Sequence, residues 1–372
     1  MSKGRSPLIE ACVGVVAVLL PALVLAGISQ PEQPADASTE MAETPRPEYD
    51  VADPAEARAF AIALLGGLDL DEADRNAKVY EIEASLDGYR AKGASASDVA
   101  LIEAVIAIEK SEFARSVELA ERAAEFASDD ADVQYVLGTA LINELSQGSF
   151  SLATARKAER AKKAWEEAVE LKPSHIGARI SLAMWHLQAP WIAGGRKGEA
   201  EKIGRSLIET GQSRWGRRIL MMTSLKRERW KEGRDRLDAL VATANTDEQR
   251  REAYITYLSP VLFEAERHRD AFDVLPAFAA VCADTDASPH YSYGRAYQAR
   301  NKKGDRDLAI NAYAKAVQTV PDARNSRWRL AELLRKADRD EEAAVHYSEF
   351  AARFPDHDDA KAAAKWAAKL ND

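Results

Sequence analysis

The chain has 372 residues, of which 46% are hydrophobic and 30% are charged, and its formal net charge at pH 7 is −9. A chain of this length makes two or three ordinary domains or one long array of repeats, and its apolar content excludes wholesale disorder. The negative net charge gives no general reason to expect a nucleic acid as partner.

The first residues have the features of an export or membrane-insertion signal. Lys3 and Arg5 precede an uncharged apolar run from Ala11 to Ile28. Signal-peptide cores typically have about 7–15 apolar residues and membrane-spanning helices about 17–25, and this run is close to the boundary between them. We favour an uncleaved anchor, and Val24-Leu25-Ala26, an acceptable cleavage site, leaves a cleaved signal as the alternative. Because positive charge precedes the run, we expect the rest of the chain to be periplasmic.

The next segments are a tether and a short helical region. Residues 29–50 are rich in proline and acidic residues, which predicts a disordered tether between residues 1–28 and the folded part. Residues 51–96 are expected to form N-terminal capping helices. The first starts at Asp53-Pro54-Ala55-Glu56, which places an N-cap, a first-turn proline and a capping-box glutamate in register. Gly66 and Gly67 end it, and a second helix is expected over 71–91.

From residue 97 the sequence repeats. Pro321 and Pro355 are 34 residues apart, and each is preceded at the same offset by a tyrosine, Tyr313 and Tyr347. In the first helix of each of five predicted helix pairs, one position is always occupied by a small residue. It is occupied by Ala104, Gly138, Ala183, Gly294 and Ala331. Two short antiparallel helices approach closely only at small residues, and proline ends the second helix because it cannot continue the hydrogen-bond ladder. Such pairs bury their apolar faces only by stacking.

This pattern resembles the tetratricopeptide repeat family. The resemblance implies an all-α fold: a right-handed α-solenoid of stacked antiparallel helix pairs, about seven of them over 97–358. Two of the repeats carry insertions, one around 143–157 and one over 188–198. Pro260 and Pro276 fall inside expected helices, which predicts kinks or shifted boundaries there. Residues 359–372 are expected to form a C-terminal capping helix.

The sequence contains no recognisable catalytic or metal-binding constellation. Its histidines are scattered, and His186 is interpreted as a packing residue. The segment 356–359 could bind a metal weakly, although a polar helix start explains it better. Cys282 is the only cysteine of the body, because Cys12 lies in the apolar run. We therefore expect no enzyme activity, no cofactor and no metal.

Charge and aromatic residues indicate where partners bind. Residues 196–236 contain 13 basic and 6 acidic residues, a net charge of +7. This belt suits an acidic partner or anionic lipid, although a solvated helix face explains it more simply. Trp191 lies in an insertion beside Pro190 and Gly194, so it is either an exposed contact or a residue that closes the core.

The family resemblance implies that the first helices of successive repeats line a concave binding surface. Residues mapped to this surface by the family pattern include Leu101, Val105, Tyr135, Ile180, Met184, Met222 and Leu225. The residues predicted to bind a partner are Trp191, Arg196, Trp215, Arg218, Tyr291, Arg295, Trp328 and Arg335. The family's arrangement for gripping a terminal carboxylate is not in register.

The function predicted from the sequence is a non-enzymatic protein-protein interaction scaffold in the bacterial cell envelope. It would be held at the inner membrane by its N-terminal segment, with partner proteins of the envelope and no nucleic acid. Two alternatives remain open. One is a small-ligand carrier or transporter accessory with a helical-repeat pore. The other is a subunit of a cytochrome c maturation complex, a role that similar anchored repeat proteins fill.

Overall fold

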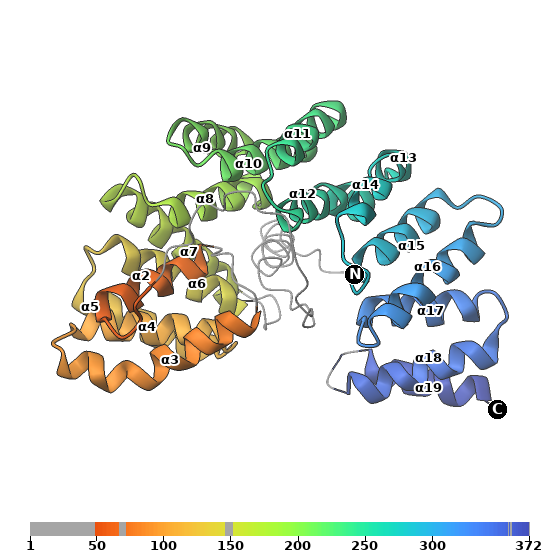
Figure 1. Cartoon of the computed structure of the whole chain (residues 1–372), viewed down its shortest axis with the longest axis horizontal. Coiled ribbons are helices and arrows are strands. Elements are labelled where there is room, and N and C mark those ends of the chain that lie inside the picture. The colour runs from red at the N-terminus through yellow and green to blue at the C-terminus, as the bar shows by residue number, and fades with distance from the viewer. Residues whose placement is uncertain (1–48, 67–71, 146–151, 356, 358, 372) are drawn as a thin grey trace, which may run out of the picture. The chain divides into compact units, whose positions relative to one another are not determined.

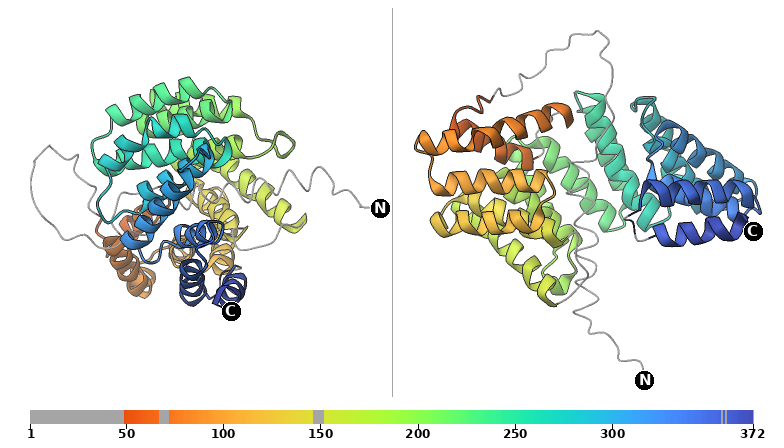
Figure 2. Two further views of the ribbon diagram at one scale, coloured as in Figure 1. Left: turned by 90° about the vertical axis from the view of Figure 1, so that its right-hand side faces the viewer. Right: turned by 90° about the horizontal axis from the view of Figure 1, so that it is seen from below.

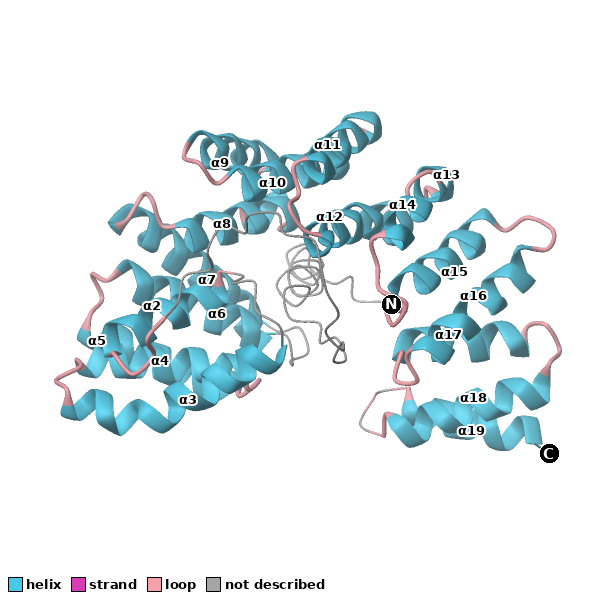
Figure 3. Cartoon of the chain, viewed as in Figure 1, coloured by secondary structure: helices cyan, strands magenta, loops and turns pink. Residues whose placement is uncertain are grey.

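The computed structural model describes residues 49–66, 72–145, 152–355, 357 and 359–371, and all of its regular structure is helical (Figures 1 and 3). The predicted anchor and most of the predicted tether lie outside these residues. The helices of the first part are α2 (Pro54–Leu65), α3 (Glu72–Ala91), α4 (Ala96–Glu109), α5 (Phe113–Phe126), α6 (Ala131–Leu145), α7 (Leu152–Leu171), α8 (Ile176–Gln188), η1 (Trp191–Ala193), α9 (Lys197–Glu209) and α10 (Ser213–Lys226). Those that follow are α11 (Trp230–Ala242), α12 (Asp247–Ser259), η2 (Pro260–Glu264), α13 (His268–Phe272), α14 (Leu275–Ala280), α15 (Ser288–Arg300), α16 (Asp305–Thr319), α17 (Arg324–Arg335), α18 (Asp340–Arg353) and α19 (Ala360–Asn371).

The chain divides into two compact units, residues 1–223 and 224–372, with the division inside α10. In unit 1 the pairs α4–α5, α6–α7 and α8–α9 follow one another, and in unit 2 the pairs α15–α16 and α17–α18 do so before α19 (Figures 1 and 2). Each unit is therefore a stack of antiparallel helix pairs, as the repeating small and aromatic positions predict.

Local capping sets the start of α2. The side chain of Asp53 accepts hydrogen bonds from the backbone N–H groups of Ala55 at 2.9 Å and Glu56 at 3.2 Å. Pro54 occupies the first helical position, where its missing N–H costs nothing, and Gly66 follows the last residue. The predicted start and end of this helix are confirmed.

Close contacts between the two helices of a pair depend on the small residues. Gly138 of α6 faces Trp165 of α7, which is fully buried, and Gly294 of α15 faces the fully buried Tyr313 of α16. A Cβ atom at either glycine would lie within 2.6 Å of the facing ring. An aromatic side chain therefore fills the space that each missing side chain leaves.

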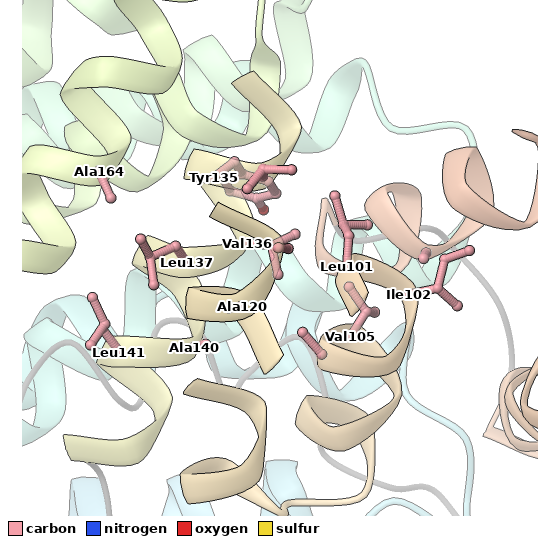
Figure 4. Close-up of a cluster of buried hydrophobic side chains, with 14 of the residues drawn as sticks. Leu101, Ile102, Val105, Ala120, Tyr135, Val136, Leu137, Ala140, Leu141 and Ala164 are labelled. Atoms are coloured by element: carbon pink, nitrogen blue, oxygen red, sulfur yellow. The ribbon is translucent and has the colours of Figure 1, made fainter. Parts of the chain in front are cut away.

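One apolar cluster of unit 1 runs through successive pairs from α2 to α8, and a second cluster joins α8, α9 and α10. Figure 4 shows side chains from α4, α5, α6 and α7 gathered in one cluster. Members labelled there include Leu101, Val105, Ala120, Tyr135, Leu141 and Ala164. Fully burying one aliphatic or aromatic side chain contributes about 1.5–3 kcal/mol, so stability here comes from stacking rather than from any single pair.

A second recurrent feature was not predicted from the sequence. The side chains of Gln134, Arg250 and Arg327 each lie early in the first helix of a pair, and each donates a hydrogen bond to the backbone carbonyl six residues earlier. The donor–acceptor distances are 2.9, 3.1 and 2.7 Å. These bonds fix the turn that joins one pair to the next.

Proline alters the regular pattern between α12 and α15. Helix α12 ends at Ser259, immediately before Pro260, which begins the π-helical turn η2. Pro276 stands at the second position of α14, where its missing N–H has no intrahelical partner to lose. η2 continues α12 directly, and the second helix of this pair is divided into α13 and α14, so helix boundaries shift here as expected.

Candidate partner-binding surfaces

The segment 189–197, called here the Trp191 loop, forms a closed turn between α8 and α9. The carbonyl of Pro190 accepts hydrogen bonds from the N–H groups of Ala193 at 2.9 Å and Gly195 at 3.0 Å. Gly194 has a φ of 82°, and a Cβ at Gly195 would collide with the carbonyl of Ala189. Both glycines are thus required by the backbone path.

Trp191 projects from this turn. Its side chain is 84% exposed, which settles the alternative left open by the sequence: it does not close the core. Arg196 is also exposed, at the N-cap of α9. An ordered turn therefore presents a large aromatic side chain to solvent, with a cation five residues later.

His186 of α8 holds the loop in place. Its Nδ1 lies 3.2 Å from the carbonyl oxygen of Gly194. Because a carbonyl only accepts, the imidazole carries its proton on Nδ1. Burial lowers the pKa of His186, which favours this neutral form. The contact agrees with the interpretation of His186 as a packing residue.

A second surface lies on the first helices of two neighbouring pairs and is called here the α8–α10 face. Ile180 and Met184 of α8, with Trp215 and Met222 of α10, are partly buried against one apolar cluster. The guanidinium of Arg218 lies 5.3 Å from the centre of the Trp215 ring, in a cation–π contact. The predicted residues Trp215 and Arg218 thus belong to one partly buried patch, which is apolar apart from the guanidinium of Arg218.

The equivalent face of α4 and α6 is not available, which corrects part of the sequence prediction. Leu101, Val105 and Tyr135 were expected to line an open concave surface, but all three are buried. Helix α2 packs against α4, and the Tyr135 hydroxyl donates to the carbonyl of Leu65 at 3.0 Å. Leu225 is buried as well. The sequence spacing correctly identified the residues that share this face of α4 and α6, but it did not show that α2 covers them.

Arg58 binds α2 to this face. Its Nη1 lies 2.8 Å from Asp98, and its Nη2 lies 2.7 Å from Asp130 and 3.1 Å from Asp132. Asp132 also lies 3.2 Å from Nε2 of His175, and hydrogen bonding to His175 is the main cause that lowers the Asp132 pKa. Two features of the sequence could have predicted this network: an arginine within an apolar helix, and aspartates at the starts of two later helices.

In unit 2, two of the predicted binding residues serve internal packing. The Trp328 ring lies 5.6 Å from that of Tyr347 and 5.1 Å from that of Phe350. The Arg335 guanidinium lies 4.4 Å from the ring of Trp366 in α19. The capping helix therefore contacts a residue that the sequence placed on a binding surface.

The other two residues of unit 2 are half-buried. Tyr291 packs against Tyr313, with ring centres 5.8 Å apart. Burial and the charge of Arg329 both lower the pKa of Arg295. Trp191, Arg196, Trp215 and Arg218 thus belong to unit 1, and the remaining four predicted residues belong to unit 2.

None of the described residues form a group of three or more histidine, cysteine, aspartate or glutamate side chains able to hold a metal ion. Burial raises the pKa of Cys282 to about 12, which keeps it from acting as a thiolate at neutral pH. Of the predicted weak metal segment, residues 356 and 358 lie outside the described residues. Among the helices that the structure describes, none is long and apolar enough to cross a membrane.

Comparison with known proteins supports the fold. A tetratricopeptide repeat family model matches residues 326–357, which include most of α17 and all of α18. The chain is similar to the structure of the human IFIT1 dimer with m7Gppp-AAAA, with 18% identity, a TM-score of 0.50, and coverage of 86% of this chain and 71% of that one. Yeast Tom70 is similar with 12% identity and a TM-score of 0.43, over 86% of this chain and 79% of that one. No curated protein matches the chain. The repeat match and the likeness to IFIT1 confirm the predicted fold class, a solenoid of tetratricopeptide type.

Proposed function

We propose that this chain is a non-enzymatic scaffold that binds a protein partner through unit 1, with Trp191 at the centre of one contact. The observation that carries the proposal is the 84% exposure of Trp191 on a turn fixed by its own backbone. Leaving an indole in water forgoes its burial, which a bound partner would recover. Tryptophan and arginine are also the side chains most enriched among residues that dominate interface energy.

The rigidity of the turn supports binding rather than accidental exposure. The bonds to Pro190, the contact with His186 and the two required glycines fix the backbone of the turn, and with it the point from which the Trp191 side chain projects. Pre-organisation of this kind reduces the conformational entropy that association must overcome. The proposed contact therefore needs no rearrangement of the loop.

Trp191→Ala separates a binding role from a structural one. Because the side chain is already exposed, we expect the free energy of unfolding to change by less than about 0.5 kcal/mol. Truncating a hot-spot tryptophan costs about 2 kcal/mol or more of binding energy, a loss of at least about 30-fold in affinity. Thermal unfolding of purified protein and partner capture by the full chain measure the two effects.

Site-specific photo-crosslinking in intact cells identifies the partner. A photoreactive residue at position 191 should crosslink one protein in high yield. The same residue at Phe126, which is 58% exposed at the end of α5, serves as the matched control. Equal crosslinking from both positions, or none from position 191, would contradict a binding role for the Trp191 loop.

We extend the proposal to the cell envelope, on the sequence of the N-terminal segment. The uncharged run from Ala11 to Ile28 would anchor the chain in the inner membrane, and residues 29–50 would tether the repeats on the periplasmic side. Full-length protein should then remain in the membrane pellet after a high-salt wash. A soluble periplasmic form that begins near residue 27 would contradict the anchor but support export, and a cytoplasmic form would contradict both.

A further inference from the structure

The contact between α17 and α18 is built around a buried arginine. Arg327 of α17 is only 2% exposed, and its Nη2 donates a hydrogen bond to the carbonyl of Pro321 in the turn before the helix. Its Nη1 contacts Glu349 and lies 3.5 Å from Nδ1 of His346, and both of these residues belong to α18. One guanidinium therefore fixes the α16–α17 turn and also joins α17 to the next helix.

This contact requires a neutral imidazole at His346. A guanidinium only donates hydrogen bonds, so the Nδ1 atom that faces Arg327 accepts and carries no proton. Protonation of the ring puts a proton on Nδ1 and leaves two positive charges in contact. The arginine does not relieve this repulsion, because a guanidinium keeps its proton in proteins. Either His346 stays neutral or the two side chains move apart.

The charged groups around His346 do not balance a second positive charge. Arg327 is the group that faces it from α17, and Glu342 and Glu349 lie on its own helix. The carboxylate of Glu349 is 4.0 Å from Nδ1 of His346, is 45% exposed and already contacts Arg327. Among the described residues of α19, which also packs on α18, no charged group contributes to the pKa of His346.

The directions of two pKa values agree with this geometry. Burial, and after it the charge of Arg327, lower the pKa of His346 and outweigh the opposing effect of Glu342. Burial and the charge of Arg353 likewise lower the pKa of Arg327. The folded site thus disfavours positive charge, and it takes up a further proton less readily than an unfolded chain does.

The position of the contact allows it to open locally. Helices α17 and α18 are the last pair of unit 2, and only α19 follows them. Each pair in such a stack contacts only its neighbours, so a terminal pair can open while the rest stays folded. The ring of Trp328 packs against Tyr347 and Phe350 across the same contact, and separation of the two helices exposes these rings.

We infer that His346 makes the α17–α18 contact acid-sensitive: protonation of its ring separates the two helices and exposes the aromatic cluster between them. Above about pH 6.5, the ordinary pKa of histidine, the contact keeps its full stability. As the pH falls below this value, the open form binds a proton more readily than the closed form, so the closed form loses stability until its own lower pKa is reached. The inference concerns unit 2 and does not rest on the proposed role of Trp191 in unit 1, so each can fail alone.

Hydrogen exchange of the full-length chain at pH 7 and pH 5, followed by mass spectrometry, tests the inference. After correction for the intrinsic pH dependence of exchange, the amides of α17 and α18 should lose protection at pH 5, by up to about 25-fold if the closed form binds no proton in this range. The amides of α4 and α5, a pair without histidine, should keep their protection. Unchanged protection of α17 and α18 would overturn the inference.

His346→Gln separates this residue from other acid-sensitive groups. A glutamine oxygen accepts a hydrogen bond from Arg327 but does not titrate, so α17 and α18 of the variant should be equally protected at pH 7 and pH 5. His290→Gln is the matched control, because His290 of α15 is also half-buried and burial lowers its pKa too. The control should keep the acid response of α17 and α18. A wild-type acid response in His346→Gln would contradict the role of His346.

A second measurement does not depend on the folding of the glutamine variant. Titration of the histidine rings by NMR in the wild-type chain should place the pKa of His346 below the ordinary value of about 6.5. Arg327→Gln keeps a donor for the carbonyl of Pro321 but removes the charge, so it should raise this pKa. A wild-type pKa at or above the ordinary value would overturn the inference, because acid would then strengthen the contact.

Discussion

Gly138→Ala tests the closest helix contact of unit 1. A Cβ at position 138 would lie 2.5 Å from Nε1 of Trp165 and 2.9 Å from the carbonyl oxygen of Ala161. The Trp165 side chain is fully buried and its Nε1 lies 3.4 Å from the Thr139 hydroxyl, while the Ala161 carbonyl belongs to a helix backbone. Neither neighbour has space to retreat, so α6 and α7 must move apart.

The size of the effect follows from two opposing terms. Alanine is favoured over glycine within a helix by about 0.5–1 kcal/mol. Overpacking typically costs about 1–3 kcal/mol, and a collision with backbone belongs to the upper part of that range. We therefore expect Gly138→Ala to lower the free energy of unfolding by about 1–2 kcal/mol.

Gly88→Ala is the matched control. Gly88 is an exposed residue of α3, and a Cβ there would have no neighbour within 4 Å. The same substitution should then stabilise the chain by about 0.5–1 kcal/mol.

Urea unfolding followed by circular dichroism compares the two variants. With a slope of about 2 kcal/mol per M, the midpoint should fall by about 0.5–1 M for Gly138→Ala and rise slightly for Gly88→Ala. If both variants raise the midpoint alike, the close approach of α6 and α7 is wrong.

Two further predictions concern charged groups. Arg58→Met leaves three aspartates facing one another and should lower the free energy of unfolding by about 1–3 kcal/mol. The control is Arg205→Met, at an exposed residue of α9, which should change the free energy of unfolding by less than about 0.5 kcal/mol. Equal effects of the two variants in urea unfolding would refute the role of Arg58. A hydrogen bond from the Arg300 guanidinium lowers the pKa of Asp305 to about 2 from its ordinary 3.8, so its contribution to stability is present above pH 3.8 and is lost as the pH falls through about 2. Carboxyl titration by NMR should show this low pKa and its rise in Arg300→Gln, and an unchanged value in the variant would refute the pairing.

Local sequence determined the helices of this protein and the way they pair. Asp53 with Pro54 marks the start of α2 because an N-cap needs only a side chain and the next few N–H groups. The contact between Gly138 and Trp165 could be predicted from the sequence for a similar reason. The contact between two antiparallel helices recurs at a fixed spacing, so it leaves a small residue in the first helix of successive pairs and an aromatic residue in several of the second helices, Trp165, Tyr313 and Tyr347.

Tertiary structure alone decided which of these surfaces remain exposed. Leu101 and Trp215 both fit the pattern of an inner face, yet the first is buried beneath α2 and the second is only half-buried. Arg58 reaches aspartates 40 to 74 residues away, and contacts at such separations follow no period of the repeat. Trp191 was equally ambiguous, because one sequence of an insertion suits either a core or a solvent position. Exposure depends on what the rest of the chain places against a side chain, and that is fixed only when distant segments pack.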